Sequence, residues 1–142
     1  MTDRHSSLKL QKRAVCIITS SGMLDHCKPL FIRLGILTFY SQYILDCLIN
    51  IRANLGKFEV RSKFHNYETR NRTLLDVPYC RLSKSRDCYP VIAQRMFNKL
   101  PTAVRALELK KFSVRMREWL RRRPYYSVRE FFEDDRVSTI SA

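Results

Sequence analysis

The sequence has 142 residues and a mass of 16.9 kDa, which is the size of one domain or less. Its 27 basic and 13 acidic side chains give a formal charge of +14, and 45% of its residues are apolar. That apolar share is enough for a hydrophobic core and argues against wholesale disorder. Five cysteines at irregular spacing do not form a disulfide framework, so we expect an intracellular chain, nuclear or cytoplasmic.

The first third of the chain predicts three helices. The first runs from Leu8 to Thr19 behind a Ser6 or Ser7 N-cap, with Leu8, Ala14, Val15 and Ile18 facing inward. A short helix starts around Pro29 and is closed by Gly35. The strongest pattern covers 38–54, where apolar residues recur every 3.6 positions and Gly56 is expected at the C′ position.

Residues 57–89 have no sustained period and are rich in Asn, Arg, Ser and Tyr, which predicts one long irregular loop. Helical periodicity returns over 90–100, before Pro101, and again in a basic helix over 110–123 that points Phe112, Met116, Trp119 and Leu120 inward. Ser127 and Glu130 have the spacing of a capping box that opens a short helix. The polar residues 134–142 predict a frayed, flexible tail.

The chain is therefore expected to be a small, mainly α domain of about five or six helices with one long loop. Its segments are a lead (1–7), a helical part (8–56), the basic polar loop (57–89), a basic helical part (90–133) and the tail (134–142). The apolar stretch 34–51 contains Ser41, Gln42, Asp46 and Asn50, which favours a buried helix over a membrane span. The polar, charged N-terminus predicts no secretory signal.

The positive charge is concentrated in residues 91–123, which carry ten basic and two acidic side chains. Arginine outnumbers lysine by 18 to 9, and its planar guanidinium suits phosphate contacts and stacking on bases. This balance favours a nucleic-acid partner, although a basic solvated face is the plain alternative.

Residues with metal-binding or catalytic chemistry are present but not in a recognisable pattern. No Cys-x-x-Cys pair exists, and His26 beside Cys27 is only sequence adjacency, so neither zinc nor a cysteine nucleophile is predicted. Asp134 and Asp135 lie on the expected tail rather than in a rigid two-metal site. We predict no metal, no cofactor and no catalytic residue on this chain.

Three basic clusters are candidates for binding RNA or DNA. The most distinctive is 65–72, where Tyr67 can stack on a base, arginines can pair with phosphates, and Asn66 and Asn71 can bond base edges. A turn-rich surface loop explains the same residues equally well. The candidate binding residues are Tyr67, Arg70 and Arg72 in this cluster, Arg81, Lys84 and Arg86 in the second, and Arg121, Arg122 and Arg123 in the third.

The order of several short motifs resembles a known family. These motifs are Leu10-Gln11-Lys12-Arg13-Ala14-Val15, His26-Cys27-Lys28-Pro29-Leu30-Phe31, Leu34-Gly35-Ile36-Leu37-Thr38, His65-Asn66-Tyr67-Glu68-Thr69-Arg70-Asn71, Phe97-Asn98-Lys99-Leu100-Pro101 and Tyr125-Tyr126-Ser127-Val128-Arg129-Glu130-Phe131. Together they resemble the region after the polymerase domain in reverse transcriptases of non-LTR retrotransposons of the LINE-like, jockey or CR1 type. The resemblance covers about residues 8–132, and His65, Tyr67, Thr69, Arg70 and Asn98 match most distinctly.

The resemblance implies an accessory segment that holds template RNA or target DNA beside a retroelement polymerase. The palm aspartates and the endonuclease of such proteins are missing, so the chain is expected to be a non-catalytic piece of a truncated element. A structural fragment that packs on the polymerase thumb, and a decayed gene product without independent function, are the alternatives. The sequence does not choose between RNA and DNA.

Overall fold

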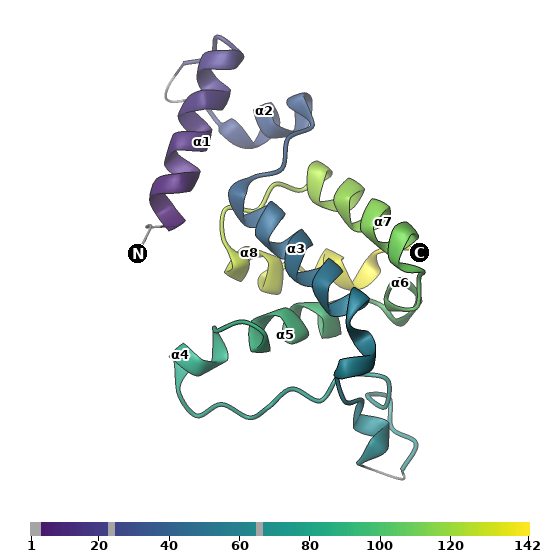
Figure 1. Cartoon of the computed structure of the whole chain (residues 1–142). Coiled ribbons are helices and arrows are strands. Elements are labelled where there is room, and N and C mark those ends of the chain that lie inside the picture. Colours follow the sequence, from purple (N-terminus) through teal and green to yellow (C-terminus); the bar gives the residue numbers. More distant parts are fainter. Residues whose placement is uncertain (1–3, 23–24, 65–66) are drawn as a thin grey trace.

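A computed structural model describes residues 4–22, 25–64 and 67–142. These residues form eight α-helices and no strand, and five of the helices have seven residues or more, which confirms the prediction of a mainly helical domain (Figure 1). The helices are α1 (Arg4–Ile18), α2 (Cys27–Leu34), α3 (Phe39–Ala53), α4 (Ser83–Arg86), α5 (Val91–Lys99), α6 (Thr102–Arg105), α7 (Leu109–Arg122) and α8 (Val128–Glu133). Short 3₁₀ turns occupy Leu55–Lys57 (η1), Arg61–Lys63 (η2) and Asp135–Thr139 (η3).

The central helix is α3, which begins where Thr38 caps it. The Thr38 hydroxyl accepts the Ser41 backbone N–H at 3.1 Å and donates to the Tyr125 carbonyl, so the cap also ties α3 to the segment after α7. Buried Ile44, Leu48 and Ile51 lie along one side of α3 at helical spacing. This side packs against α5 and α7, as the predicted period required.

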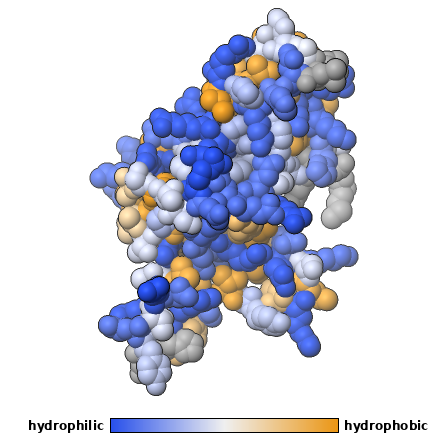
Figure 2. Space-filling view, turned by 180° about the vertical axis from the view of Figure 1, so that it is seen from behind, coloured by the Kyte–Doolittle hydropathy of each residue, from blue (hydrophilic) through white to orange (hydrophobic). Residues whose placement is uncertain are grey.

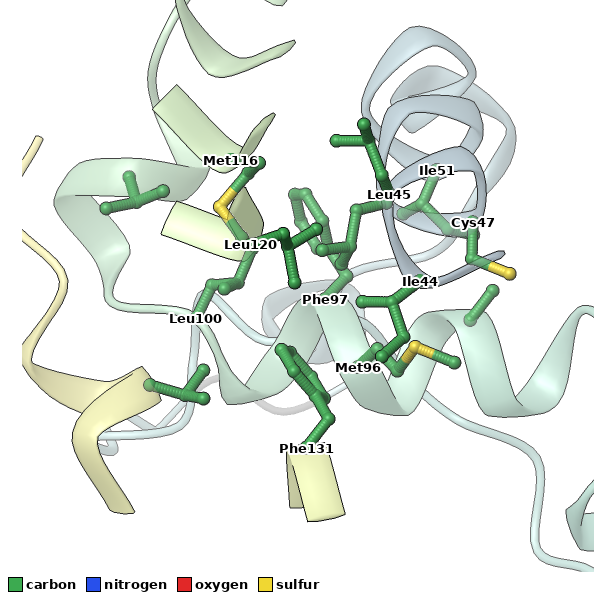
Figure 3. Close-up of a cluster of buried hydrophobic side chains, with 14 of the residues drawn as sticks. Ile44, Leu45, Cys47, Ile51, Met96, Phe97, Leu100, Met116, Leu120 and Phe131 are labelled. Atoms are coloured by element: carbon green, nitrogen blue, oxygen red, sulfur yellow. The ribbon is translucent and has the colours of Figure 1, made fainter. Parts of the chain in front are cut away.

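The core fills the space between α3, α5, α7 and α8. Figure 3 shows Phe97 of α5 and Leu120 of α7 beside the α3 side chains, with Phe131 of α8 below them. Phe97, Leu120 and Phe131 are at most 2% exposed. Such apolar burial is the main favourable term in folding, so this cluster holds the four helices together. Trp119 is partly buried against the same cluster, as expected.

α1 and α2 pack against each other at a steep angle beside this core (Figure 1). Gln11 ties α1 to the main body, because its amide donates to the Leu37 carbonyl at 2.8 Å and accepts the Phe39 N–H at 2.7 Å. The predicted inward face of α1 is only half right: Leu8 and Val15 are buried, but Ala14 and Ile18 are exposed. α1 has its main neighbours, α2 and α3, on one side only, so the stripe through Ile18 meets solvent.

Gly35 ends α2 as predicted, in the left-handed conformation with φ 65°. The Gly35 N–H donates to the Ile32 carbonyl, and the Ile36 N–H donates to the Phe31 carbonyl. This pattern is a Schellman-type cap, which favours glycine because the residue has no Cβ. The prediction that Gly56 occupies the C′ position of the next helix is wrong. α3 ends at Ala53 with Asn54 as its C-cap, and Gly56 lies inside η1.

The last nine residues are not the flexible tail that their polarity predicted. Val137 and Ile140 are 0% and 4% exposed and join the main core. The Asp134 carboxylate fixes the start of η3 by accepting the Arg136 N–H at 3.1 Å, and Arg115 of α7 donates to the Ser141 carbonyl at 2.7 Å. Two apolar residues among polar ones were enough to dock this segment.

α8 opens as the capping box predicted, with one change. The Ser127 hydroxyl accepts the Glu130 N–H at 3.1 Å, but the Glu130 carboxylate reaches back to the N–H of Tyr126 rather than that of Ser127. The same carboxylate pairs with Lys28 at 2.9 Å and so joins α8 to α2.

In the part of the chain that the structure describes, no single helix is long and apolar enough to cross a membrane. α2 and α3, which meet at a bend of 54°, satisfy that test of length and composition only as a pair.

Candidate nucleic-acid interface

The nine predicted binding residues lie in three separate parts of the fold. Tyr67, Arg70 and Arg72 are in the loop after η2, Arg81, Lys84 and Arg86 are in or beside α4, and Arg121, Arg122 and Arg123 are at the end of α7. Figure 1 shows the loop after η2, α4 and the end of α7 well apart from one another. Among the described residues, the structure therefore gives three basic regions rather than one patch.

The first region contains a hollow of about 520 Å³, which we call the loop hollow. It is lined by Arg61, Ser62, Phe64, Tyr67, Thr69, Asn71, Arg72 and Asp76. The aromatic side chains of Tyr67 and Phe64 are 82% and 55% exposed, so both rings are open to solvent. Arginines and exposed rings thus share one concave surface, to which the predicted cluster contributes Tyr67 and Arg72, whereas Arg70 is not among the described lining residues.

The arginines of the loop hollow have acidic neighbours, but the pairings are weak. Arg72 contacts Glu68 at 3.2 Å and Arg61 lies 3.9 Å from Asp76, with every partner at least 41% exposed. Solvent-exposed ion pairs contribute little free energy and exchange readily. A phosphate can therefore compete for both guanidinium groups. His65 and Asn66, which belong to the same motif, lie outside the described residues.

The loop hollow is held in place by a pairing of two backbone segments. Leu75 and Val60 form an isolated antiparallel bridge, in which the Arg61 N–H donates to the Leu74 carbonyl at 3.0 Å and the Asp76 N–H donates to the Glu59 carbonyl at 2.8 Å. The Leu75 side chain is 2% exposed and enters the core. The bridge thus closes the base of the loop hollow and anchors it to the core.

Asn98 of α5 attaches the same backbone segment to α5. Its side-chain oxygen accepts the Leu75 N–H at 2.8 Å and its amide donates to the Leu75 carbonyl at 2.9 Å. Asn98, which the family resemblance singled out, therefore contacts the backbone of its own chain. Its role in this structure is to position the loop.

Arg105 is a second anchor, and the sequence did not single it out. The side chain is 9% exposed and donates to the carbonyls of Leu100 at 3.0 Å and Thr73 at 2.9 Å. It also contacts the hydroxyls of Thr73 and Thr102. None of the acids in the described part of the chain forms an ion pair with it, and carbonyl and hydroxyl oxygens satisfy this buried guanidinium.

The second region surrounds α4, where Arg81, Lys84 and Arg86 are all exposed. Arg86 lines a hollow that also contains Arg95 and Arg129. Two acids, Asp87 and Glu133, line the same hollow, so its charge is largely balanced. Tyr40 and Phe132 also line this hollow, and the Arg95 guanidinium lies over the Phe132 ring, 4.8 Å from its centroid.

In the third region, the arginine triplet points to two different places. Arg121 lines a groove of about 620 Å³ between α1, the 35–39 connection and α7, and Arg117, one turn earlier, lines it too. Among the described residues that line this groove, none is acidic. We call it the α7 groove. Its two guanidinium groups make it an anion-attracting site.

Gly35 makes room for Arg121 in the α7 groove. A Cβ on Gly35 would lie 2.3 Å from Nη2 of Arg121, so the guanidinium rests on the glycine backbone. This packing holds the Arg121 guanidinium at the groove. In the described chain this guanidinium forms no ion pair.

Arg122 and Arg123 line a different hollow, together with Lys28 and Arg136. Four acids balance these charges there, namely Glu130, Glu133, Asp134 and Asp135. Arg123 also stacks over the Trp119 ring, 4.2 Å from its centroid. The triplet thus supplies one cation to an uncompensated groove and two to a balanced surface.

Asp134, expected on a solvated tail, is instead held inside this hollow. Its side chain is 8% exposed, Arg136 donates to it at 2.8 Å and the Tyr125 hydroxyl donates to it at 2.8 Å. The Arg136 hydrogen bond lowers the pKa of Asp134 to about 2. Burial and this carboxylate together raise the pKa of Tyr125.

The described residues contain no cluster of three or more potential metal ligands.

The chain is thus a small, basic, mainly helical domain with an aromatic loop hollow and an arginine-lined groove. No protein family model matches it, and neither a curated protein nor a solved structure shows significant similarity to it.

Proposed function

We propose that this chain is a non-catalytic segment that binds nucleic acid, related to the post-polymerase region of non-LTR retrotransposon reverse transcriptases. The observation that carries the proposal is the loop hollow, where exposed Tyr67 and Phe64 lie beside Arg61 and Arg72. Aromatic rings stack on unpaired bases while arginines contact the adjacent phosphates, which is how proteins bind single strands with little sequence preference.

The distribution of charge supports the same proposal. Six ion pairs join described residues, whereas the whole chain has 27 basic side chains. The back of the molecule is covered largely by hydrophilic side chains (Figure 2). Long-range attraction of a phosphate backbone follows from such an excess, and the α7 groove supplies two further guanidinium groups to a strand or duplex.

A salt titration tests the proposal. The full chain is titrated into labelled single-stranded RNA and duplex DNA at several salt concentrations. If it engages about five phosphates, log K falls against log salt with a slope near −4 to −5. Affinity that is independent of salt contradicts the proposal.

Two tyrosines make a matched pair of variants for the same titration. Tyr67→Ala removes the ring from the loop hollow, and Tyr79→Ala removes a ring that is 90% exposed in the same loop but does not line the hollow. Loss of one stacked base costs about 1–3 kcal/mol, or roughly 5- to 150-fold in affinity. We expect that loss for Tyr67→Ala on single strands only. Equal affinity of the two variants would contradict stacking at the hollow.

A second candidate function is a packing role in a larger polymerase, as an interaction fragment on its thumb. The observation that favours it is the outer side of α1, where Leu10, Ile17 and Ile18 are 64%, 78% and 65% exposed. Exposed apolar stripes of this kind mark interfaces or cause self-association. Size-exclusion chromatography with and without nuclease separates the two functions: nuclease-sensitive complexes indicate nucleic acid, and nuclease-resistant oligomers indicate packing.

A further inference from the structure

Two cysteine thiols meet where α1 packs against α2. Sγ of Cys16, on α1, lies 3.5 Å from Sγ of Cys27, the first residue of α2. Cys16 is 5% exposed, whereas Cys27 is half-buried and reaches solvent. Cys80 and Cys88, by contrast, donate to backbone carbonyls, those of Pro78 and Ser85.

The thiol pair opens into a hollow of about 640 Å³ beside α1, away from the loop hollow and the α7 groove. Lys9, Lys12 and Arg13 line this hollow together with both cysteines, and none of its described lining residues is acidic. The hollow is large enough for a small organic molecule. Its cations attract anions to within reach of the two sulfur atoms.

We propose that Cys16 and Cys27 form a dithiol site that exchanges with an anionic, low-molecular-weight disulfide such as oxidised glutathione. In the first step the Cys27 thiolate attacks one sulfur of that disulfide, forms a mixed disulfide and releases one glutathione thiolate. In the second step the Cys16 thiolate attacks Sγ of Cys27, closes the Cys16–Cys27 bond and releases the second thiolate. The protein loses two electrons and two protons, which the two glutathione thiols carry away.

The geometry sets the order of the two steps. Cys27 reaches solvent and takes the incoming disulfide, whereas Cys16 is buried behind it and is positioned to resolve the mixed disulfide. A disulfide bond is about 2.05 Å long, so the sulfur atoms approach by roughly 1.5 Å on closure, which small side-chain rotations can supply. The bond would join α1 to α2 across eleven positions of sequence.

The charges around Cys27 make the exchange depend on pH. Burial and the neighbouring Cys16 raise the pKa of the Cys27 thiol, Asp25 adds to this, and Lys12 on α1 opposes it. Tyr126, whose ring lies under the Lys12 amine, stays neutral at the pH values where thiols titrate, because burial raises its pKa to about 12. The thiolate fraction is therefore small at neutral pH, and the rate rises through the alkaline range.

The test uses the full, reduced chain in glutathione buffers of increasing oxidation, followed by alkylation and peptide mass mapping. We expect a product lighter by two hydrogens, with Cys16 and Cys27 in one cross-linked peptide, while Cys80 and Cys88 stay alkylated. A stable glutathione adduct on Cys27 of the unmodified chain would overturn the proposal. Oxidation of all exposed cysteines to the same extent, or of neither Cys16 nor Cys27, would overturn it too.

Variants check the two steps separately. Cys16→Ser is expected to stop at the mixed disulfide on Cys27, and Cys88→Ser, the control, is expected to form the Cys16–Cys27 bond as before. The double variant Lys9→Gln with Arg13→Gln should slow exchange with oxidised glutathione several-fold while leaving exchange with neutral hydroxyethyl disulfide unchanged. An equal effect on both reagents would refute the role of the cations. The peptide map of the unmodified chain needs no variant and gives a result even if Cys16→Ser does not fold.

Discussion

The anchor between Asn98 and Leu75 allows a quantitative prediction for Asn98→Ala. The substitution removes two hydrogen bonds, of 2.8 and 2.9 Å, and leaves the N–H and carbonyl of Leu75 without a protein partner in a partly buried site. Each such bond contributes about 0.5–1.5 kcal/mol, and unpaired buried groups add a penalty, so we expect a loss of about 2–3 kcal/mol. For a domain of this size the melting temperature should fall by roughly 6–9 °C.

Urea unfolding followed by Trp119 fluorescence and by circular dichroism measures this loss. A lower midpoint with an unchanged slope shows that stability fell without a change in the surface exposed on unfolding. Asn54→Ala is the matched control, because that amide bonds within its own helix, to Asn50, through hydrogen bonds that are exposed to solvent. We expect the control to cost about 0.5 kcal/mol or less. If Asn98→Ala were no more destabilising than Asn54→Ala, the anchor would not hold the loop.

Substitutions at three further positions, Arg105, Asp134 and Gly35, test other contacts by the same unfolding assay. Arg105→Met should cost about 3 kcal/mol and Arg105→Lys roughly half of that, since lysine keeps the charge but cannot bond several oxygens at once; equal costs would contradict this. The pKa of Asp134, about 2, lies below the value of about 3.9 in unfolded chains, so its contribution is complete above pH 4 and is lost as pH falls toward 2. Because the partner Arg136 is 66% exposed, we expect about 1 kcal/mol, and Asp134→Asn should remove that pH dependence. Gly35→Ala should cost about 1–2 kcal/mol of stability because alanine disfavours the positive φ at this position. We expect the same cost in an Arg121→Ala background, because the Arg121 guanidinium can rotate away from the new Cβ. A cost that vanishes in that background would show that a clash between the Cβ and the guanidinium is responsible instead.

The long helices could be predicted because the residues that determine them are close together in the sequence. The period of 3.6 in 38–54 and 110–123 marked the buried sides of α3 and α7, and Gly35 and Ser127 marked helix ends. α6 has only four residues, too few for any period to be visible, and it was missed. The docking of 134–142 depends on Val137 and Ile140 finding the core, which no local pattern encodes.

The candidate site was predicted only in part, for the same reason. Tyr67 and Arg72 do share a hollow, because they are close in sequence within one turn-rich loop. The arginine triplet looked like one cluster, but adjacent helical positions are 100° apart and so point to different surroundings. Asn98 and Arg105 act on backbone atoms 23 and 32 positions away, which only the folded chain brings near.

The anchor at Leu75 also divides the long loop into two arms with different freedom to evolve. Asn98 recognises only the N–H and carbonyl of residue 75, which every amino acid except proline presents. The side chains of 61–72 can therefore be substituted, and the segment 76–89 can be lengthened or shortened, without a change in how the loop is attached to α5. The same scaffold can thus present new binding surfaces, which makes 61–72 a natural segment to randomise when a different ligand is sought.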